Sequence, residues 1–324
     1  WYRNPTWERR PIPGIYQALT AYDLDGDGGV ELIAIKRNPQ YPDDAYKGLC
    51  SDLWWVKPVD PLNGKWEEHF IGRGDGDWPH GAVVAACLPG GKLALITAYH
   101  NRAHQELFEV PADPTQSPWP KCVIAEAAYS EELVPYDLNH DGKLDIIAGQ
   151  FWFENKGDGT FQTHVIAENY YTARLGLADL NGDGRVDLVL GQEVMDYPNK
   201  IIPFSSLKWF EQPPDPRTSP WIGHTIDSVR CAHSVSVGDI DGDGEPEIII
   251  GEHDPFWPYR KRCRAFVYKK AEPKGRAWYR YLIDGRFEHH VGTKLIDLGE
   301  GKLGIISQGW QDRLYVHLWT VKAL

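Results

Sequence analysis

Apolar and polar residues alternate along much of this chain with a period of two, in short runs separated by Gly, Pro and Asp. A second kind of run is almost wholly apolar, as at 31–35 (ELIAI) and 247–251 (EIIIG). Alternation indicates half-buried β-strands, and short apolar runs bounded by turn residues are typical of strands buried on both faces. No segment sustains the helical period of about 3.6 residues. The pattern therefore predicts an all-β chain.

Four kinds of strand recur in a fixed order, which we call A, B, C and D. Strand A runs into an acidic loop, strand B leaves it, strand C is aromatic, and strand D begins with an aromatic residue and ends near Ile. A–B pairs occur six times, although the turns at 87–92 and 297–302 lack most of the acidic residues. Repeated units of four short antiparallel strands favour a β-propeller.

The number of blades depends on which strand is counted. A–B pairs give six blades and C strands give seven, so we favour six four-stranded blades and keep seven as the alternative. The chain starts with C-like and D-like strands and stops just after a C strand. We therefore expect the N-terminal strand at 7–12 to complete the last blade and close the ring. One propeller domain would then span residues 1–324.

Four A–B turns carry the motif Asp-x-Asp/Asn-x-Asp-Gly, with a further acidic residue four positions after the third ligand. Alternate side chains of such a loop converge on one point, and an oxygen-only set suits Ca²⁺ better than transition metals. The alternative is an Asx-rich turn that holds without metal. We expect structural Ca²⁺ in two to four of the loops. The ligands would be Asp23, Asp25, Asp27, Glu31, Asp137, Asn139, Asp141, Asp145, Asp179, Asn181, Asp183, Asp187, Asp239, Asp241, Asp243 and Glu247.

These loops, together with the aromatic strand at 151–155 (FWFEN) and strands such as 161–166 (FQTHVI), resemble the FG-GAP/VCBS repeat propellers. The resemblance covers nearly the whole chain. The family includes integrin heads, lectins, polysaccharide lyases and sugar dehydratases. In style the repeats look most like the propeller domains of aldos-2-ulose dehydratases and their bacterial relatives. The resemblance thus implies a calcium-binding propeller, with carbohydrate as the expected ligand.

The D–A and B–C connections lie at the end of each blade opposite the acidic loops, so their residues should gather around one central mouth. The predicted catalytic residues there are His80, His233, Arg174, His290 and Tyr171. The predicted substrate-binding residues are Gln150, Gln192, Glu193, Trp310 and Glu132. A possible second metal site would use His100, Glu252 and His253, because imidazole and carboxylate suit a borderline divalent ion.

These residue types favour proton abstraction next to a carbonyl or carboxylate, with a His or Tyr as base and Arg174 or a metal stabilising the enolate. The expected activity is therefore β-elimination, by a lyase or dehydratase acting on an oxidised sugar or a uronate-containing glycan. A lectin would instead need equivalent pockets between blades, whereas the mouth residues differ from blade to blade. A protein-interaction propeller is the third alternative.

Composition narrows the partners. The formal net charge is −12 and there is no basic stripe, so nucleic acid is not an expected partner. No run approaches the roughly 18 apolar residues of a membrane-spanning helix. The repeats and their expected calcium lead us to expect an extracellular or periplasmic protein. The sequence does not predict an oligomeric state.

Overall fold

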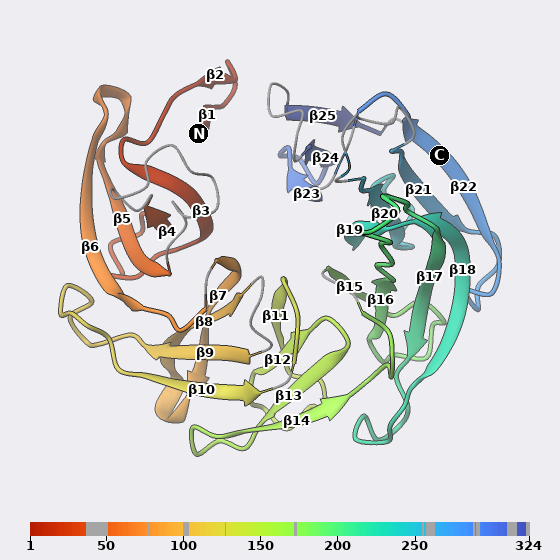
Figure 1. Cartoon of the computed structure of the whole chain (residues 1–324), viewed down its shortest axis with the longest axis horizontal. Coiled ribbons are helices and arrows are strands. Elements are labelled where there is room, and N and C mark those ends of the chain that lie inside the picture. Colours follow the sequence, from red (N-terminus) through yellow and green to blue (C-terminus); the bar gives the residue numbers. More distant parts are fainter. Residues whose placement is uncertain are drawn as a thin grey trace. The chain divides into compact units, whose positions relative to one another are not determined.

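The computed structural model describes residues 1–36, 51–76, 78–99, 104–126, 128–171, 174–254, 256, 263–287, 289, 292–309 and 316–321. Six successive antiparallel sheets account for nearly all strands, and these ranges contain no α-helix (Figure 1). The fold is an all-β propeller with six blades, mainly of four strands, as the number of A–B pairs predicted. No described helix has the length and apolarity needed to cross a membrane.

Within each blade the strands pair in the order in which they follow one another in sequence. Blade I comprises β3 (Ile15–Tyr22), β4 (Glu31–Lys36), β5 (Asp52–Asp60) and β6 (Lys65–Arg73). Blade II comprises β7 (Pro79–Leu88), β8 (Lys92–Tyr99), β9 (His104–Glu109) and β10 (Lys121–Glu126). Blade III comprises β11 (Leu133–Tyr136), β12 (Asp145–Ala148), β13 (Phe151–Asn155) and β14 (Phe161–Val165). Blade IV comprises β15 (Leu175–Ala178), β16 (Asp187–Gly191), β17 (Phe204–Glu211) and β18 (Ile222–Arg230). Blade V comprises β19 (Ala232–Gly238), β20 (Glu247–Glu252), β21 (Ala265–Lys270) and β22 (Trp278–Asp284). Blade VI comprises β23 (Gly292–Asp297), β24 (Leu303–Gln308) and β25 (Val316–Thr320).

The N-terminal segment forms a small sheet of its own. β1 (Tyr2–Arg3) pairs with β2 (Glu8–Arg9), and neither joins another sheet among the described residues. Only two residues of the expected strand at 7–12 are therefore extended and paired, and blade VI has three described strands rather than four. Closure of a ring by this segment stays a prediction.

Contacts divide the chain into two compact units. Unit 1 consists of Trp1–Ala148 with Phe153–Thr163, and unit 2 of Gly149–Trp152 with His164–Leu324. Blades I and II lie in unit 1, together with most of blade III, and blades IV to VI lie in unit 2. The assignment of residues 1–324 to one domain stays a prediction.

In blades IV and V, burial is greatest on strand B and least on the outer strand D. Every residue of strands β16 and β20 is buried, whereas the D strands β18 and β22 are largely exposed. In unit 2 the core between blades IV and V packs Val189 and Trp209 against Val235 and Ile248. Strand B is apolar on both faces because each face is covered by a neighbouring sheet, which explains its unbroken apolar run.

Tryptophans on strand C tie neighbouring blades together. The indole of Trp209 is fully buried and its Nε1–H donates to the carbonyl oxygen of Gly275, in the C–D loop of blade V, at 2.8 Å. In unit 1 the Trp55 indole likewise donates to the Pro114 carbonyl of blade II at 3.0 Å. A D-strand histidine packs on the indole in both units, as His224 does on Trp209 with ring centroids 4.3 Å apart.

Replacing Trp209 by Phe should lower the free energy of unfolding by about 1–2 kcal/mol, because the indole hydrogen bond is lost inside the core. Chemical denaturation measures this loss. Trp7→Phe is the matched control, since Trp7 is 42% exposed. Equal stability losses in the two variants would contradict a latching role for the indole.

Candidate functional site

The two ends of each blade carry different chemistry. In blade V the start of β19 pairs with the end of β20, as Ala232 faces Glu252, whereas Gly238 faces Glu247 beside the acidic loop. Blade IV has the same arrangement, with Leu175 facing Leu190. Residues at strand A starts and strand B ends therefore share one end of each sheet, opposite the acidic loops. This is the end to which the predicted catalytic residues belong.

Two glycines allow the ends of blades IV, V and VI to approach closely in unit 2. A Cβ on Gly191 would lie 2.3 Å from the carbonyl oxygen of Ala232, and one on Gly251 would lie 2.6 Å from that of His289. Neither approach is possible for a residue with a side chain. The glycines thereby bring His233 and His289, from blades V and VI, next to the ends of the preceding B strands.

His233 and His253 form a buried pair at this end of blade V. They are 2% and 4% exposed, and their rings meet edge to face with centroids 5.4 Å apart. Both backbone N–H groups donate to the carbonyl oxygen of Cys231, at 2.8 and 3.0 Å. Histidine is the side chain that most often transfers protons in catalysis, so this pair is suited to proton transfer or to orienting a group that performs it.

Glu252 is held by an arginine. Its carboxylate is fully buried and accepts hydrogen bonds from Arg264 Nε and Nη2 at 2.8 and 2.6 Å, and from the Arg230 N–H at 3.0 Å. The pairing raises the pKa of Arg264. A metal ion bound by Glu252 and His253 would have to compete with this bidentate ion pair. No close cluster of three metal-ligating side chains within the described ranges includes either residue.

Blade IV supplies the exposed part of the site. Tyr171 is 43% exposed, and its carbonyl oxygen accepts the N–H of Glu193 at 3.0 Å. Glu193 itself is 8% exposed. The Gln192 side-chain oxygen accepts the hydroxyl of Ser206 at 3.1 Å, which fixes the amide. Arg174 is half-buried just before β15. Four of the predicted residues thus lie at one end of blade IV.

His289 belongs to the same end of blade VI, as its place before strand A predicts, but the contacts it makes there were not predicted from the sequence. His289 is fully buried, with Nδ1 2.9 Å from Ser307 Oγ and Nε2 3.3 Å from Asp284 Oδ2. Burial lowers the pKa of His289, although the Asp284 carboxylate opposes the shift. Ser307 is only 2% exposed, which makes it a partner for the ring rather than a nucleophile. Asp284 ends β22, His289 lies between β22 and β23, and Ser307 lies on β24, so their spacing carries no signal.

The remaining predicted residues are placed as follows. His80 is the second residue of strand β7, and its ring centroid lies 4.5 Å from that of Trp78. Glu132 is half-buried, and its carbonyl oxygen accepts the Ser130 hydroxyl at 2.7 Å. The side-chain oxygen of Gln150 is buried without a hydrogen-bond partner in the described parts of the chain. His100, His290 and Trp310 lie outside the described residues.

The four acidic loops are named after their blades: loop I (23–31), loop III (137–145), loop IV (179–187) and loop V (239–247). In each loop, the closing carboxylate accepts the N–H of the second loop residue. The pairs are Glu31 with Leu24 at 2.8 Å, Asp145 with Leu138 at 3.1 Å, Asp187 with Leu180 at 2.9 Å, and Glu247 with Ile240 at 3.0 Å. The four loops therefore share one conformation, as their common motif predicted.

The loops form acidic clusters that could bind a metal ion. In loop I, carboxylate oxygens of Asp23, Asp25 and Asp27 lie within 4.8 Å of one another, and loop V has an equivalent group that includes Glu247. Burial raises the pKa of Glu247, like that of Asp187 in loop IV, to about 7. One buried oxygen of Glu31 has no hydrogen-bond partner among the described residues. Such carboxylates are costly to bury without a cation, so the donor sets fit a hard divalent ion.

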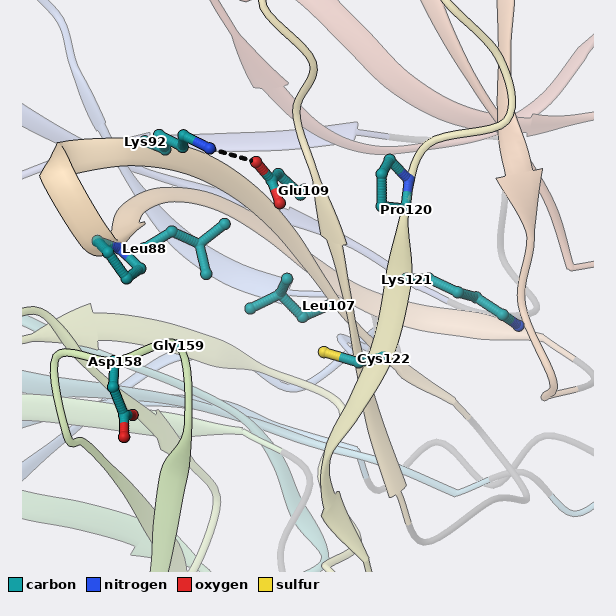
Figure 2. Close-up of a pocket in the computed structure, with 10 residues that line it drawn as sticks. Leu88, Lys92, Leu107, Glu109, Pro120, Lys121, Cys122, Asp158 and Gly159 are labelled. Atoms are coloured by element: carbon teal, nitrogen blue, oxygen red, sulfur yellow. Dashed lines mark hydrogen bonds and ion pairs between the residues drawn. The ribbon is translucent and has the colours of Figure 1, made fainter.

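A separate cavity of about 430 Å³ lies in unit 1 (Figure 2). Leu88 and Leu107 form part of its apolar lining, and the ion pair of Lys92 with Glu109 lies at its rim. The cavity is next to the A–B turn of blade II, at the end opposite the predicted mouth. No aromatic residue lines it, so it lacks the stacking platform expected of a lectin pocket.

Comparisons with known proteins agree with the repeat fold described above. Residues 137–190 match an FG-GAP-like repeat and residues 232–255 match an FG-GAP repeat. No curated protein matches the sequence significantly. Similar solved structures include the exotype rhamnogalacturonan lyase YesX (TM-score 0.53, 13% identity, 96% of this chain and 62% of that chain) and the rhamnogalacturonan lyase YesW (0.50, 15%, 96% and 61%). The V. cholerae biofilm matrix protein Bap1 aligns with a TM-score of 0.47 at 14% identity, over 85% of this chain and 41% of that chain.

At such identities the likeness to the lyases concerns the fold. The chain spans about three fifths of the length of the two lyase chains.

Stability should depend on pH through His289. Because its pKa is lower in the folded than in the unfolded chain, the unfolded chain takes up the proton first as pH falls. The free energy of unfolding should therefore fall below about pH 6.5, the ordinary range of histidine. Denaturant unfolding of wild type and His289→Gln at several pH values checks this, and the variant should show the flatter profile. The exposed His140, changed to Asn, is the control; a His289→Gln profile as steep as that of wild type would count against the assignment.

Proposed function

We propose that this FG-GAP repeat propeller is a carbohydrate-active protein that performs β-elimination on a uronate-containing glycan or an oxidised sugar. What supports the proposal is that Tyr171 and Arg174 lie at the end of blade IV opposite its acidic loop, and that the buried pair His233–His253 lies at the same end of the neighbouring blade V. The fold likeness to rhamnogalacturonan lyases is consistent with this reaction class.

The reaction requires three functions. A base removes the proton from the carbon next to the carboxylate or carbonyl, and a positive group stabilises the enolate that forms. The electron pair of the broken C–H bond then forms the new C=C bond. The β-carbon–oxygen bond breaks, and its electrons leave with the oxygen, which takes up a proton. The products are an unsaturated sugar and a free hydroxyl group or water.

Two side chains can serve as the base, and they differ in exposure. Tyr171 is open to solvent and can meet a glycan directly, whereas His233 is almost completely buried. We therefore assign proton transfer at the glycan to Tyr171 and enolate stabilisation to Arg174. His233 and His253 are positioning residues in this assignment. His80, His290 and the predicted substrate-binding residues Gln150, Gln192, Glu193, Trp310 and Glu132 stay candidates for glycan contacts.

Incubation with uronate-containing glycans or oxidised sugars should raise the ultraviolet absorbance, because the unsaturated product absorbs. Tyr171→Phe should lower kcat by about 100-fold or more, the usual contribution of a general base. His233→Gln should lower kcat less and shift the pH profile. Tyr279→Phe is the matched control, since Tyr279 is 58% exposed on the outer strand β22.

Absence of product across a broad panel, combined with measurable glycan binding, would replace the lyase by a lectin. A loss of activity in His233→Gln alone, with Tyr171→Phe unaffected, would instead make His233 the base.

We also propose that at least two of the four acidic loops bind Ca²⁺ and that the ion stabilises the A–B turns rather than taking part in the reaction. The support is the oxygen-only donor set and the raised pKa of the buried closing residue Asp187 in loop IV. The low millimolar calcium outside cells suits modules of this kind. An extracellular or periplasmic location is therefore part of the proposal.

Chelation should lower the melting temperature, and added CaCl2 should restore it. Each occupied site contributes roughly 2.7 kcal/mol when free Ca²⁺ is about 100-fold above its Kd. Asp179→Asn should reduce the calcium-dependent part of the stability, because Asp179 lies in loop IV. Asp158→Asn is the control, since Asp158 caps a C–D turn through Thr160 and belongs to no acidic loop. A melting curve indifferent to both chelator and CaCl2 would overturn the calcium assignment.

A further inference from the structure

Strand C places different residues opposite the closing carboxylates of the acidic loops. The antiparallel register pairs Leu32 with Val56, Ile248 with Tyr268, and Leu188 with Phe210. One step further along each ladder, the facing residues are Glu31 and Lys57 in blade I, Glu247 and Lys269 in blade V, and Asp187 and Glu211 in blade IV. The same position is therefore basic in two blades and acidic in a third.

In loop I the lysine reaches the point on which the ligand oxygens converge. Asp25 and Asp27 each use one oxygen to accept an N–H of the loop itself, from Asp27 and Gly29. Their other oxygens both accept hydrogen bonds from Lys57 Nζ, the one on Asp27 at 2.6 Å. The ammonium thus occupies the place at which a bound cation would meet these two carboxylates.

Loop V repeats the arrangement. Lys269 Nζ donates to Asp241 and lies 2.9 Å from Asp243 Oδ2 and 3.7 Å from Glu247 Oε1. The Lys269 side chain is 20% exposed. Carboxylates held within 4.8 Å of one another repel, and both clusters with this spacing contain an ammonium group.

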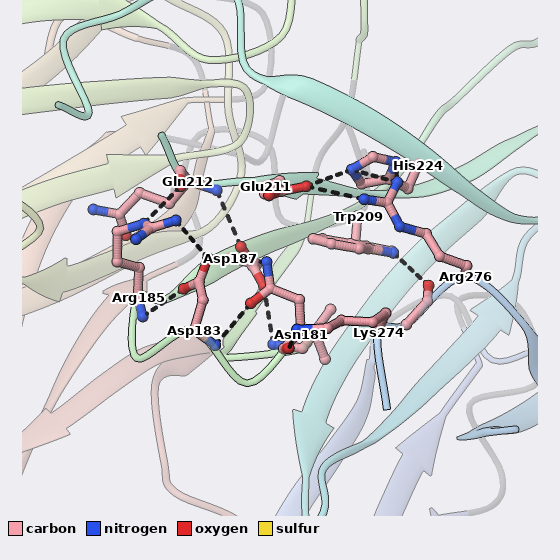
Figure 3. A network of polar contacts seen from close by, with 12 residues as sticks. Asn181, Asp183, Arg185, Asp187, Trp209, Glu211, Gln212, His224, Lys274 and Arg276 are labelled. Carbon is pink, nitrogen blue, oxygen red and sulfur yellow. Dashed lines mark hydrogen bonds and ion pairs between the residues drawn. The ribbon is translucent and has the colours of Figure 1, made fainter. Parts of the chain in front are cut away.

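Loop IV has no such lysine. Its third position is Asn181, whose amide donates to Asp183 Oδ2 at 3.0 Å, and Arg185 reaches the same carboxylate from the solvent side (Figure 3). Glu211 is linked instead to His224 at 2.9 Å and to Arg276 at 3.2 Å.

Loop III resembles loop IV. Its third position is Asn139, and its basic partner is Lys143, which contacts Asp141 alone among the loop carboxylates, at 2.6 Å. Lys143 is 39% exposed and belongs to the loop itself rather than to strand C. Its contact can therefore be given up to a metal ion without disturbing the core.

The residue at the third loop position correlates with the presence of the strand C lysine. It is Asp in loops I and V, where strand C supplies lysine, and Asn in loops III and IV, where it does not. Each lysine-containing loop thus has one more carboxylate than the others, and one ammonium to balance it. The chain therefore limits the negative charge of these loops in two ways: loops I and V add a lysine, and loops III and IV replace one carboxylate by an amide.

We propose that Lys57 and Lys269 act as built-in cations, so that loops I and V fold without a metal ion and Ca²⁺ is bound by loops III and IV. The part concerning loops III and IV rests on the calcium binding proposed above. The part concerning the lysines stands on the convergence of ligand oxygens on each Nζ.

Isothermal titration of the whole, chelator-treated chain with CaCl2 tests the proposal. Wild type should bind two ions, and Lys57→Met and Lys269→Met should each bind one more, because methionine keeps the apolar stem and removes the charge. In chelator both variants should melt at lower temperature than wild type, and CaCl2 should restore them. Lys92→Met is the matched control, because Lys92 pairs with Glu109 in blade II, which carries none of the four acidic loops, and its stoichiometry should equal that of wild type.

Binding of four ions by wild type, or unchanged stoichiometry in both lysine variants, would overturn the proposal. If wild type bound no Ca²⁺ and each lysine variant bound one ion, the proposal that loops III and IV bind Ca²⁺ would be wrong. The proposal that Lys57 and Lys269 replace a metal ion would still hold.

Should the lysine variants fail to fold, the double variant Asp137→Asn/Asp179→Asn keeps the test decisive, because both lysines remain. This double variant should bind no Ca²⁺ under the proposal. Any ion that it still binds would have to lie in loop I or loop V, and the proposal would fall.

Discussion

A buried carboxylate at the first residue of strand B organises this chain. In four blades it accepts the N–H of the second loop residue, as Asp187 does from Leu180, and so joins the end of strand A to the start of strand B. This contact fixes the register of the A–B pair. Because side chains alternate across a strand, the register also decides which residues enter the core between blades. The position of every residue at the opposite end of the sheet follows from it.

That constraint explains why the two ends of a blade differ in character. The acidic loops must repeat, since each has to satisfy the same buried carboxylate with the same backbone N–H groups. At the opposite end no such requirement exists, apart from glycines such as Gly191 and Gly251 that let the next blade approach. Side chains there vary freely from blade to blade, from Tyr171 in blade IV to His233 in blade V. Repeated acidic loops at one end of the blades are therefore compatible with a site at the other end whose residues differ from blade to blade.

The sequence predicted the repeated features well and the isolated ones poorly. Strand order, the six A–B pairs and the conformation of the acidic loops all follow from local patterns, namely alternation, apolar runs and turn residues. The contacts of Glu252 were not predictable in this way, because its partner Arg264 lies just before another strand, β21, and no repeat marks it. The contacts of His289 with Asp284 and Ser307 were not predicted for the same reason. The N-terminal strand was expected to be longer because its pattern resembles strand D, but only Glu8–Arg9 pairs.

The charge in the loops shows how a repeat can change while its fold stays constant. A closing carboxylate that is buried, such as Asp187, favours its neutral form unless a positive charge is close by. The backbone hydrogen bond alone does not remove this cost, so each loop needs a cation from some source. A lysine on strand C is covalently available and fixed in number, whereas a metal ion depends on its concentration in the surroundings. The residue at one position of strand C is therefore enough to decide whether the stability of a blade depends on the surrounding metal-ion concentration. The register of the A–B pair, which positions the residues at the opposite end, stays the same.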